Sequence, residues 1–286
     1  MVRTCLMCAA AILGMTTLSA GEEVVIPNHA PTTAGTGAYS TVLHPQPRSY
    51  QLVVGPSELG DLPAGAMITG IAWRRPTWIV YPDWPGIGAT ATFANFDISL
   101  STSLNPPGSL SSTYTENIGP DVVQVRDGAF SPGGAFFPGG ALTPAVNPFG
   151  QTLQFDQPYE YAGGDLLLTV RHTGNGSSNG FLDTVGSAAT QAIGVSSYTQ
   201  ETEWYSQGLI VMKLTFDPPN ETTPADINGD VVVDGIDLGI LLANWSIPAG
   251  SPGCGGAPGG CAADINGDVV VDGIDLGILL AAWTLK

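Results

Sequence analysis

The chain ends in a nearly perfect internal repeat, and this repeat restricts how it can fold more than any other feature. Residues 225–245 read ADINGDVVVDGIDLGILLANW, and residues 263–283 read ADINGDVVVDGIDLGILLAAW. The two copies differ only where Asn244 stands in place of Ala282. Because general composition cannot produce such identity, we expect the two segments to fold as two copies of one structural unit.

Each copy contains a loop with oxygen-bearing side chains at the spacing that calcium prefers. Ca²⁺ takes about six to eight oxygen ligands, and an EF-hand loop supplies them from positions 1, 3, 5, 7, 9 and 12. In the first loop these positions hold Asp226, Asn228, Asp230, the carbonyl of Val232, Asp234 and Asp237. In the second loop they hold Asp264, Asn266, Asp268, the carbonyl of Val270, Asp272 and Asp275. The sequence therefore predicts two bound Ca²⁺ ions as cofactors.

A helix is expected after each loop. The apolar residues at helical spacing are Leu238, Leu241, Leu242 and Trp245 in the first copy, and Leu276, Leu279, Leu280 and Trp283 in the second. Within each loop, an apolar residue at position 8, Val233 or Val271, is expected to anchor the loop to a core.

The two segments resemble dockerin type I repeats, which are duplicated loop–helix units without the entering helix of an ordinary EF-hand. The resemblance covers both loops without a gap inside either repeat. It implies that residues 225–286 form a small, calcium-dependent helical domain. It also implies a cohesin-like partner protein, extracellular or on a cell surface.

One departure from the dockerin pattern concerns loop position 6. That position is usually Gly, because the chain turns sharply there with positive φ. This chain has Val231 and Val269 instead. A β-branched residue is strained in that conformation, so either the loops turn differently or their calcium affinity is lowered.

The second departure concerns partner recognition. In dockerins, partner choice depends on positions that are often occupied by hydroxyl and basic residues. By resemblance, these positions are Gly235, Ile236, Leu242 and Ala243 in the first copy, and Gly273, Ile274, Leu280 and Ala281 in the second. Such an apolar set indicates either a hydrophobic partner surface or packing of the repeats on each other. The near identity of the copies would let either one face a partner. The alternative is that calcium only holds the tail folded.

The N-terminus has the pattern of a signal peptide, residues 1–20. Arg3 precedes an apolar stretch, and small residues follow at Ser19, Ala20 and Gly21. We therefore expect a secreted protein, extracellular or associated with a cell surface, with no membrane span after cleavage. Of the cysteines outside this segment, Cys254 and Cys261 are expected to form a disulfide, with free thiols as the alternative.

Residues 21–216 are expected to form a mainly β domain, an antiparallel sandwich of jelly-roll type. The 38 glycines and 23 prolines disfavour long helices. In Ala94–Leu100, apolar residues alternate with polar ones, as in a half-buried strand. Further candidate strands are Ser49–Val54, Ile68–Trp73, Asp121–Arg126, Asp165–Arg171 and Gly208–Phe216. The Pro-containing residues 217–224 are expected to be a linker.

The function of this β domain is less clearly indicated. No catalytic motif is present, and no catalytic residue is assigned. The histidines His29, His44 and His172 lack metal-ligand spacing and are expected at the surface or in turns. The net charge of −17 disfavours nucleic acid as a partner. The aromatic residues Trp73, Trp78 and Trp84 could stack on a glycan, or they could belong to the core.

Two classes of function therefore remain. The first is a non-catalytic protein that docks its β domain onto an extracellular partner. The second is a component associated with polysaccharide breakdown, either a carbohydrate-binding module or a glycoside hydrolase. Acidic residues such as Asp97 and Asp121 are numerous enough for a glycosidase pair.

Overall fold

The computed structural model describes residues 21–78, 80–202, 205–219, 223–230, 232–246 and 261–283. The expected signal peptide, Val231 and Cys254 lie outside these ranges. The chain divides into two compact units, Met1–Pro218 and Pro219–Lys286. This boundary falls inside the stretch 217–224. Among the described helices, none has both the length and the apolar character that crossing a membrane requires.

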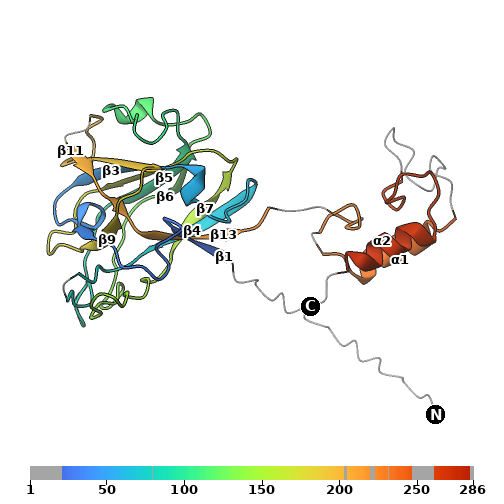
Figure 1. Cartoon of the computed structure of the whole chain (residues 1–286), viewed down its shortest axis with the longest axis horizontal. Coiled ribbons are helices and arrows are strands. Elements are labelled where there is room, and N and C mark those ends of the chain that lie inside the picture. Colours follow the sequence, from blue (N-terminus) through green and yellow to red (C-terminus); the bar gives the residue numbers. More distant parts are fainter. Residues whose placement is uncertain are drawn as a thin grey trace, which may run out of the picture. The chain divides into compact units, whose positions relative to one another are not determined.

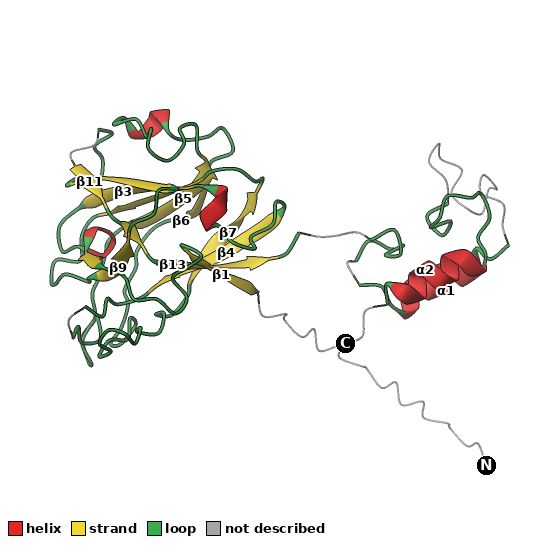
Figure 2. Ribbon diagram, in the orientation of Figure 1, coloured by secondary structure: helices red, strands yellow, loops and turns green. Residues whose placement is uncertain are grey.

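The first unit is mainly β, and the strand pairs of its described sheets are antiparallel (Figures 1 and 2). One sheet has the order β1 (Glu22–Ile26), β13 (Met212–Asp217), β4 (Ala66–Trp73) and β7 (Leu153–Tyr161). A second has the order β11 (Tyr205–Gln207), β10 (Thr190–Val195), β3 (Arg48–Val54), β8 (Leu166–His172), β5 (Phe96–Thr102) and β6 (Val123–Arg126). A small third sheet has the order β12 (Leu209–Ile210), β9 (Leu182–Val185) and β2 (Gly37–Tyr39).

The alternation of apolar and polar residues explains how these strands pack. In β5, Phe96, Ile98 and Leu100 are buried while Asp97 and Ser99 are partly exposed. The strand begins later than the sequence predicts, because Ala94 is exposed and precedes it.

One continuous hydrophobic core joins the two larger sheets. It includes Ile68 of β4 and Leu214 of β13 from the four-stranded sheet, and Leu52 of β3 and Leu168 of β8 from the six-stranded sheet. Burial of these aliphatic side chains between the sheets is the main force that holds the unit together.

The second unit contains two helices, α1 (Gly235–Ala243) and α2 (Gly273–Ala281). Its core is built from equivalent residues of the two copies. The buried pairs are Ala225 with Ala263, Val233 with Val271, and Leu241 with Leu279, joined by Cys261. The predicted anchoring role of Val233 and Val271 is therefore confirmed, since both side chains are buried in this core.

Candidate metal centre

Each helix of the second unit starts at a capping box formed by two aspartates. The Asp234 side chain accepts a hydrogen bond from the N–H of Ile236 at 2.7 Å, and Asp237 Oδ2 accepts one from the N–H of Asp234 at 2.9 Å. These bonds satisfy backbone N–H groups that the first turn of a helix leaves without partners. Asp272 and Asp275 form the same box at the start of α2.

Asp237 also ties the beginning of the loop to the helix. Its Oδ1 accepts hydrogen bonds from the N–H groups of Ile227 at 2.8 Å and Asn228 at 3.1 Å. Burial by itself would raise the pKa of Asp237, but the N–H groups of Asp234, Asn228 and Ile227 outweigh it and hold the pKa below its ordinary value. The side chain is therefore a carboxylate at neutral pH.

The side chains at loop positions 1, 3 and 5 are oriented by the loop's own backbone. Asp226 Oδ1 accepts from the N–H of Gly229 at 2.8 Å and from that of Asp230 at 3.1 Å. Asn228 Oδ1 accepts from Asp230 N–H at 2.9 Å, and Asp230 Oδ1 accepts from Val232 N–H at 3.0 Å. These local turns fix the side chains of Asp226, Asn228 and Asp230 against the backbone of their own loop.

The second loop repeats most of this arrangement. Asp268 N–H donates to Asp264 Oδ1 at 3.1 Å and to Asn266 Oδ1 at 2.9 Å, and Val270 N–H donates to Asp268 Oδ1 at 3.0 Å. Identical sequences thus give closely similar loop conformations.

Loop position 6 adopts the strained conformation in the second copy. Val269 has φ 79°, in the left-handed region that favours glycine. Of the two possibilities that the sequence left open, the second loop therefore turns in the sense usual for this position, and the valine bears the strain. Such a conformation costs about 1–3 kcal/mol for a residue other than glycine.

The donor atoms fit calcium in their chemistry. Every predicted ligand atom is an oxygen, and each loop carries four carboxylates whose mutual repulsion a divalent cation would relieve. Their oxygens accept bonds from backbone N–H groups, and within the described ranges no three His, Cys, Asp or Glu side chains gather as a metal-binding cluster. The case for calcium therefore rests on the type and spacing of the donors.

The predicted partner positions all lie at the surface. The exposed fractions are 57% for Ile236, 52% for Leu242, 57% for Ile274 and 53% for Leu280. Gly235, Ala243, Gly273 and Ala281 are exposed as well. The repeats pack on each other through Leu241 and Leu279, so packing between the copies does not account for the apolar character of these eight positions.

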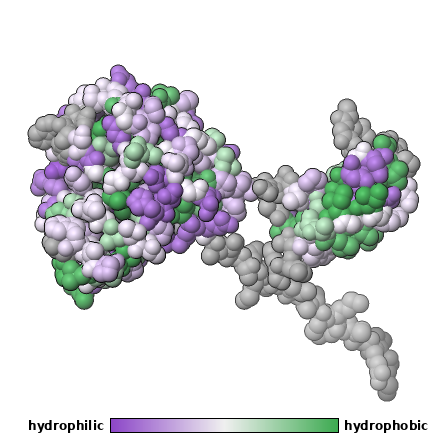
Figure 3. All heavy atoms as spheres, in the orientation of Figure 1, coloured by the Kyte–Doolittle hydropathy of each residue, from purple (hydrophilic) through white to green (hydrophobic). Residues whose placement is uncertain are grey.

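The exposed apolar surface is larger than the sequence predicts. Ile278 is 38% exposed and Trp245 is 39% exposed, so both add to it. Helical spacing from Ile274 could have identified Ile278, since it lies one turn further along α2. Figure 3 shows apolar residues over a broad part of the visible surface of this unit.

Of the two cysteines predicted to form a disulfide, only Cys261 lies among the described residues. Cys261 is buried and disulfide-bonded, next to Ala263 in the core of the unit. Cys254, its expected partner, lies outside the described residues.

The tryptophan platform considered for glycan binding is not formed. Trp73 and Trp84 are only 1% and 4% exposed and belong to the core of the β domain. Trp78 is 49% exposed and lies edge to face with Tyr81, with ring centroids 6.0 Å apart. A core role was the alternative for these residues, and for Trp73 and Trp84 it is the correct one.

No family model matches this chain, and a search of curated proteins finds no significant match. The resemblance to dockerin repeats therefore rests on the residues of the two loops and helices.

Proposed function

We propose that this is a secreted, calcium-binding, dockerin-like protein. Its C-terminal unit would dock the β domain, a jelly-roll-like sandwich, onto a cohesin-like extracellular or cell-surface partner. The observation that carries the proposal is the exposure of apolar side chains at the positions where the resemblance places partner contacts, above all Ile236 and Ile274.

Exposed apolar side chains on a small unit call for a partner. Ile236, Leu242, Ile274 and Leu280 are each more than half exposed, while the core of the same unit is composed of few side chains. Where exposed apolar side chains gather on a surface, they mark interaction sites. The small neighbours Gly235 and Gly273 let a partner's backbone approach closely.

Calcium would act on this surface through the helix starts. Asp237 and Asp275 are both the predicted last ligands of their loops and members of the capping boxes. A cation held by the loop would therefore stabilise the first turn of each helix, where Ile236 and Ile274 lie. Partner binding should depend on calcium for this reason.

The alternative function is a role in polysaccharide breakdown. Its hydrolase version has weaker support than docking. Asp97 accepts hydrogen bonds from the Tyr198 hydroxyl at 2.5 Å and the Gly128 N–H, and Asp121 accepts from Thr102 and the Tyr159 hydroxyl. Both carboxylates thus have structural partners. A binding function for the β domain remains compatible with these contacts.

The docking proposal can be tested by capture of extracellular proteins from the source culture on the immobilised chain, with and without chelator. We expect a specific partner to be retained in calcium and released by chelator. If either copy can face the partner, Ile236→Asp alone should preserve binding, and the double variant Ile236→Asp/Ile274→Asp should abolish it.

The difference between the copies supplies a control. Asn244→Ala makes the first repeat identical to the second and should leave capture unchanged. Undiminished capture by the double isoleucine variant would contradict the proposed contact surface, and capture in chelator would contradict the calcium dependence.

A further inference from the structure

The β domain contains a seam where one strand passes from one sheet to another. β11 pairs with β10 in the six-stranded sheet, with Gln207 opposite Ala192. β12 pairs with β9 in the three-stranded sheet, with Leu209 opposite Val185. Between these two pairings, residues 186–191 lie opposite the single residue Gly208. Because these residues outnumber their partner, they cannot all pair with it, and a gap is left between the two strands.

On the core side of this seam, a tyrosine hydroxyl bonds to the backbone of the interrupted strand. The buried Tyr50 hydroxyl donates to the Gly208 carbonyl at 3.0 Å and accepts from the Ile210 N–H at 3.4 Å. These bonds satisfy backbone groups that the interruption of the strand would leave unpaired. The opening is thus an integral part of the fold.

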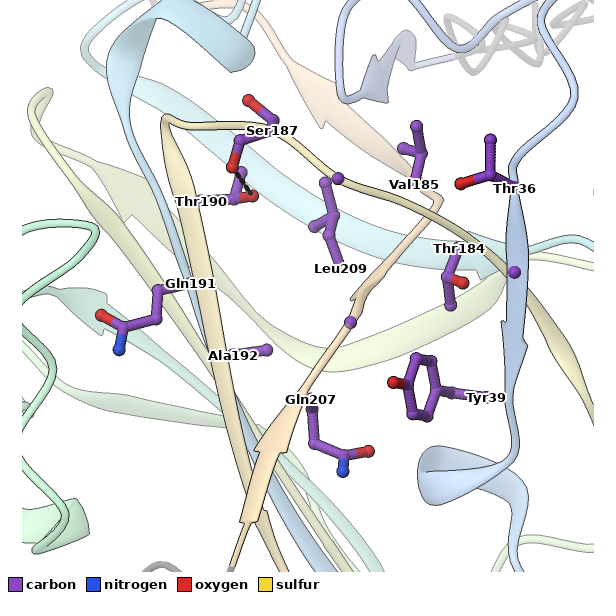
Figure 4. A pocket seen from close by; sticks show the side chains of 13 residues that line it. Thr36, Tyr39, Thr184, Val185, Ser187, Thr190, Gln191, Ala192, Gln207 and Leu209 are labelled. Carbon is purple, nitrogen blue, oxygen red and sulfur yellow. Dashed lines mark hydrogen bonds between the residues drawn. The ribbon is translucent and has the colours of Figure 1, made fainter.

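A pocket of about 320 Å³ occupies this opening (Figure 4). Its volume is near the lower end of the range for small-molecule sites, about 300–1,000 Å³. None of the residues that line it is charged, although the chain carries a net charge of −17. Most of the lining side chains bear hydroxyl or amide groups, among them Thr36, Thr184 and Gln207.

One aromatic ring faces this polar pocket. Tyr39 is 40% exposed, and Figure 4 shows it beside Thr184 and near Gln207. A Cβ at Gly208 would lie 2.6 Å from Tyr39 Cε2, so the ring packs directly against glycine backbone. A Cβ at Gly37 would likewise lie 2.7 Å from the Thr184 hydroxyl oxygen. Any side chain at the two glycines would therefore collide with the ring or with the Thr184 hydroxyl, and Thr184 itself is only 4% exposed.

Some polar groups of the pocket are hydrogen-bonded within the protein, and others can bond to a ligand. Gln207 is held in place, because its Oε1 accepts from the Thr41 hydroxyl and its Nε2 donates to the Ser206 carbonyl. Within the described part of the chain, the hydroxyls of Thr36, Tyr39 and Thr184 have no hydrogen-bond partner in the protein. Each can both donate and accept.

We propose that this pocket binds a neutral saccharide, with Tyr39 against the sugar ring and the hydroxyls of Thr36 and Thr184 bonded to its hydroxyl groups. A charged ligand would lose its hydration without gaining an opposite charge. A purely apolar ligand would leave the threonine hydroxyls unsatisfied. A polyol with apolar C–H faces matches both the hydroxyls and the aromatic ring.

This site is separate from the docking surface and from Trp78. The pocket lies wholly in the first unit and has no carboxylate in its lining. Saccharide binding should therefore be insensitive to chelator, whereas the proposed docking should be lost. The two proposals can fail independently.

The experiment is a binding screen of the full chain against glucose, galactose, mannose, xylose, N-acetylglucosamine and their disaccharides, by saturation-transfer NMR followed by calorimetry. We expect at least one sugar to bind equally well in calcium and in chelator. Tyr39→Ala and Thr184→Val should each weaken it about tenfold, the loss expected from one stacking or hydrogen-bonding partner. Trp78→Ala should leave the affinity unchanged.

Substitutions at two glycines can distinguish a blocked pocket from an unfolded protein. A Cβ at Gly186, in the pocket lining, meets nothing within 4 Å, and the same is true of Gly133, which does not line the pocket. Neither glycine has positive φ. Gly186→Leu should block binding and Gly133→Leu should preserve it, with both variants unfolding at the parent temperature.

Three results would overturn the proposal. One is the absence of binding by every neutral sugar tested. Another is binding that survives Tyr39→Ala and Gly186→Leu in folded protein. The third is binding lost in Trp78→Ala but retained in the pocket variants, which would move the saccharide site to the exposed tryptophan.

Discussion

Val269 holds a backbone conformation that β-branched residues seldom adopt. Its φ of 79° lies close to that of Gly267, φ 73°, in the same loop, but only the glycine adopts such a value without steric cost. The side chain does not offset this cost by burial, because it is 54% exposed. The loop therefore contains a strain that a single substitution can remove.

Val269→Gly is expected to tighten calcium binding about fivefold. Relief of roughly 1–3 kcal/mol of strain exceeds the roughly 0.5–1 kcal/mol of extra chain entropy that glycine costs. Calcium titration followed by calorimetry checks this. Val270→Gly is the matched control, since Val270 has no positive φ and should gain nothing. Equal weakening by both substitutions would disprove the strain argument.

His172 differs from the surface or turn histidine that the sequence predicts, because it is fully buried at the end of β8. One ring nitrogen, Nε2, lies 2.7 Å from the Thr41 carbonyl, and Nδ1 accepts from the Gly174 N–H at 3.0 Å. Its pKa is lowered to about 4, mainly by burial and to a smaller extent by the nearby His44 and Arg48, against the opposite effect of the Thr41 carbonyl. The imidazole is therefore neutral in the folded chain.

The β domain should lose stability as the pH falls from 6.5 towards 4. In this window His172 is protonated in the unfolded chain but stays neutral in the folded chain. Lowering the pH to about 4 therefore reduces the free energy of unfolding by about 3 kcal/mol. Above pH 6.5 this contribution is constant. Urea unfolding across this range should show a steeper loss in the parent than in His172→Gln. Identical slopes would mean that His172 titrates normally.

At the scale of elements, each short helix buries only one narrow stripe. Consecutive helical residues point about 100° apart, so Leu241 and Leu242 cannot both face the same small core. Leu241 is fully buried, whereas Leu242 is 52% exposed. The sequence placed both residues on the apolar face of the helix and named Leu242 as a partner position as well, and its exposure fits that second role.

The strands show where sequence patterns suffice and where they fail. Central strands such as β3 and β8 are apolar along most of their length and could be predicted. β7 could not, because most of its residues are exposed and it contains Pro158. The pocket beside Tyr39 could not be predicted from the sequence either, because it arises from the pairing registers of strands that are far apart in sequence. The ligand positions of the two loops, by contrast, could be predicted from sequence alone because they are local in sequence, and they stay a prediction.

Leu241→Ala should strongly destabilise the C-terminal unit, and Leu242→Ala should not. Removing a fully buried leucine costs about 2–5 kcal/mol, a large share of what so small a core provides. Thermal unfolding of the full chain in calcium, followed by far-UV circular dichroism, compares the two neighbours directly. Similar loss in both variants would contradict the burial pattern.

At the scale of the whole molecule, the main hydrophobic core of the β domain is separate from the core of the helical unit. The core of the β domain and that of the helical unit share no residue among the described positions, and the compact units meet in a Pro-rich stretch. A core of dozens of side chains stabilises the first unit by itself. In its described residues, the second unit has few buried side chains, the disulfide-bonded Cys261 and two loops rich in carboxylate.

This difference predicts that calcium controls the stability of one unit only. Calorimetry of the full chain in millimolar calcium should give two transitions, and chelator should remove or lower one of them while the other keeps its temperature. The reason is that a ligand stabilises only the unit whose folded form binds it, by an amount that grows with the logarithm of its concentration. Circular dichroism identifies the sensitive transition as the loss of helix. A chelator effect on both transitions, or on neither, would show that the aspartate loops do not act as an independent calcium-dependent unit.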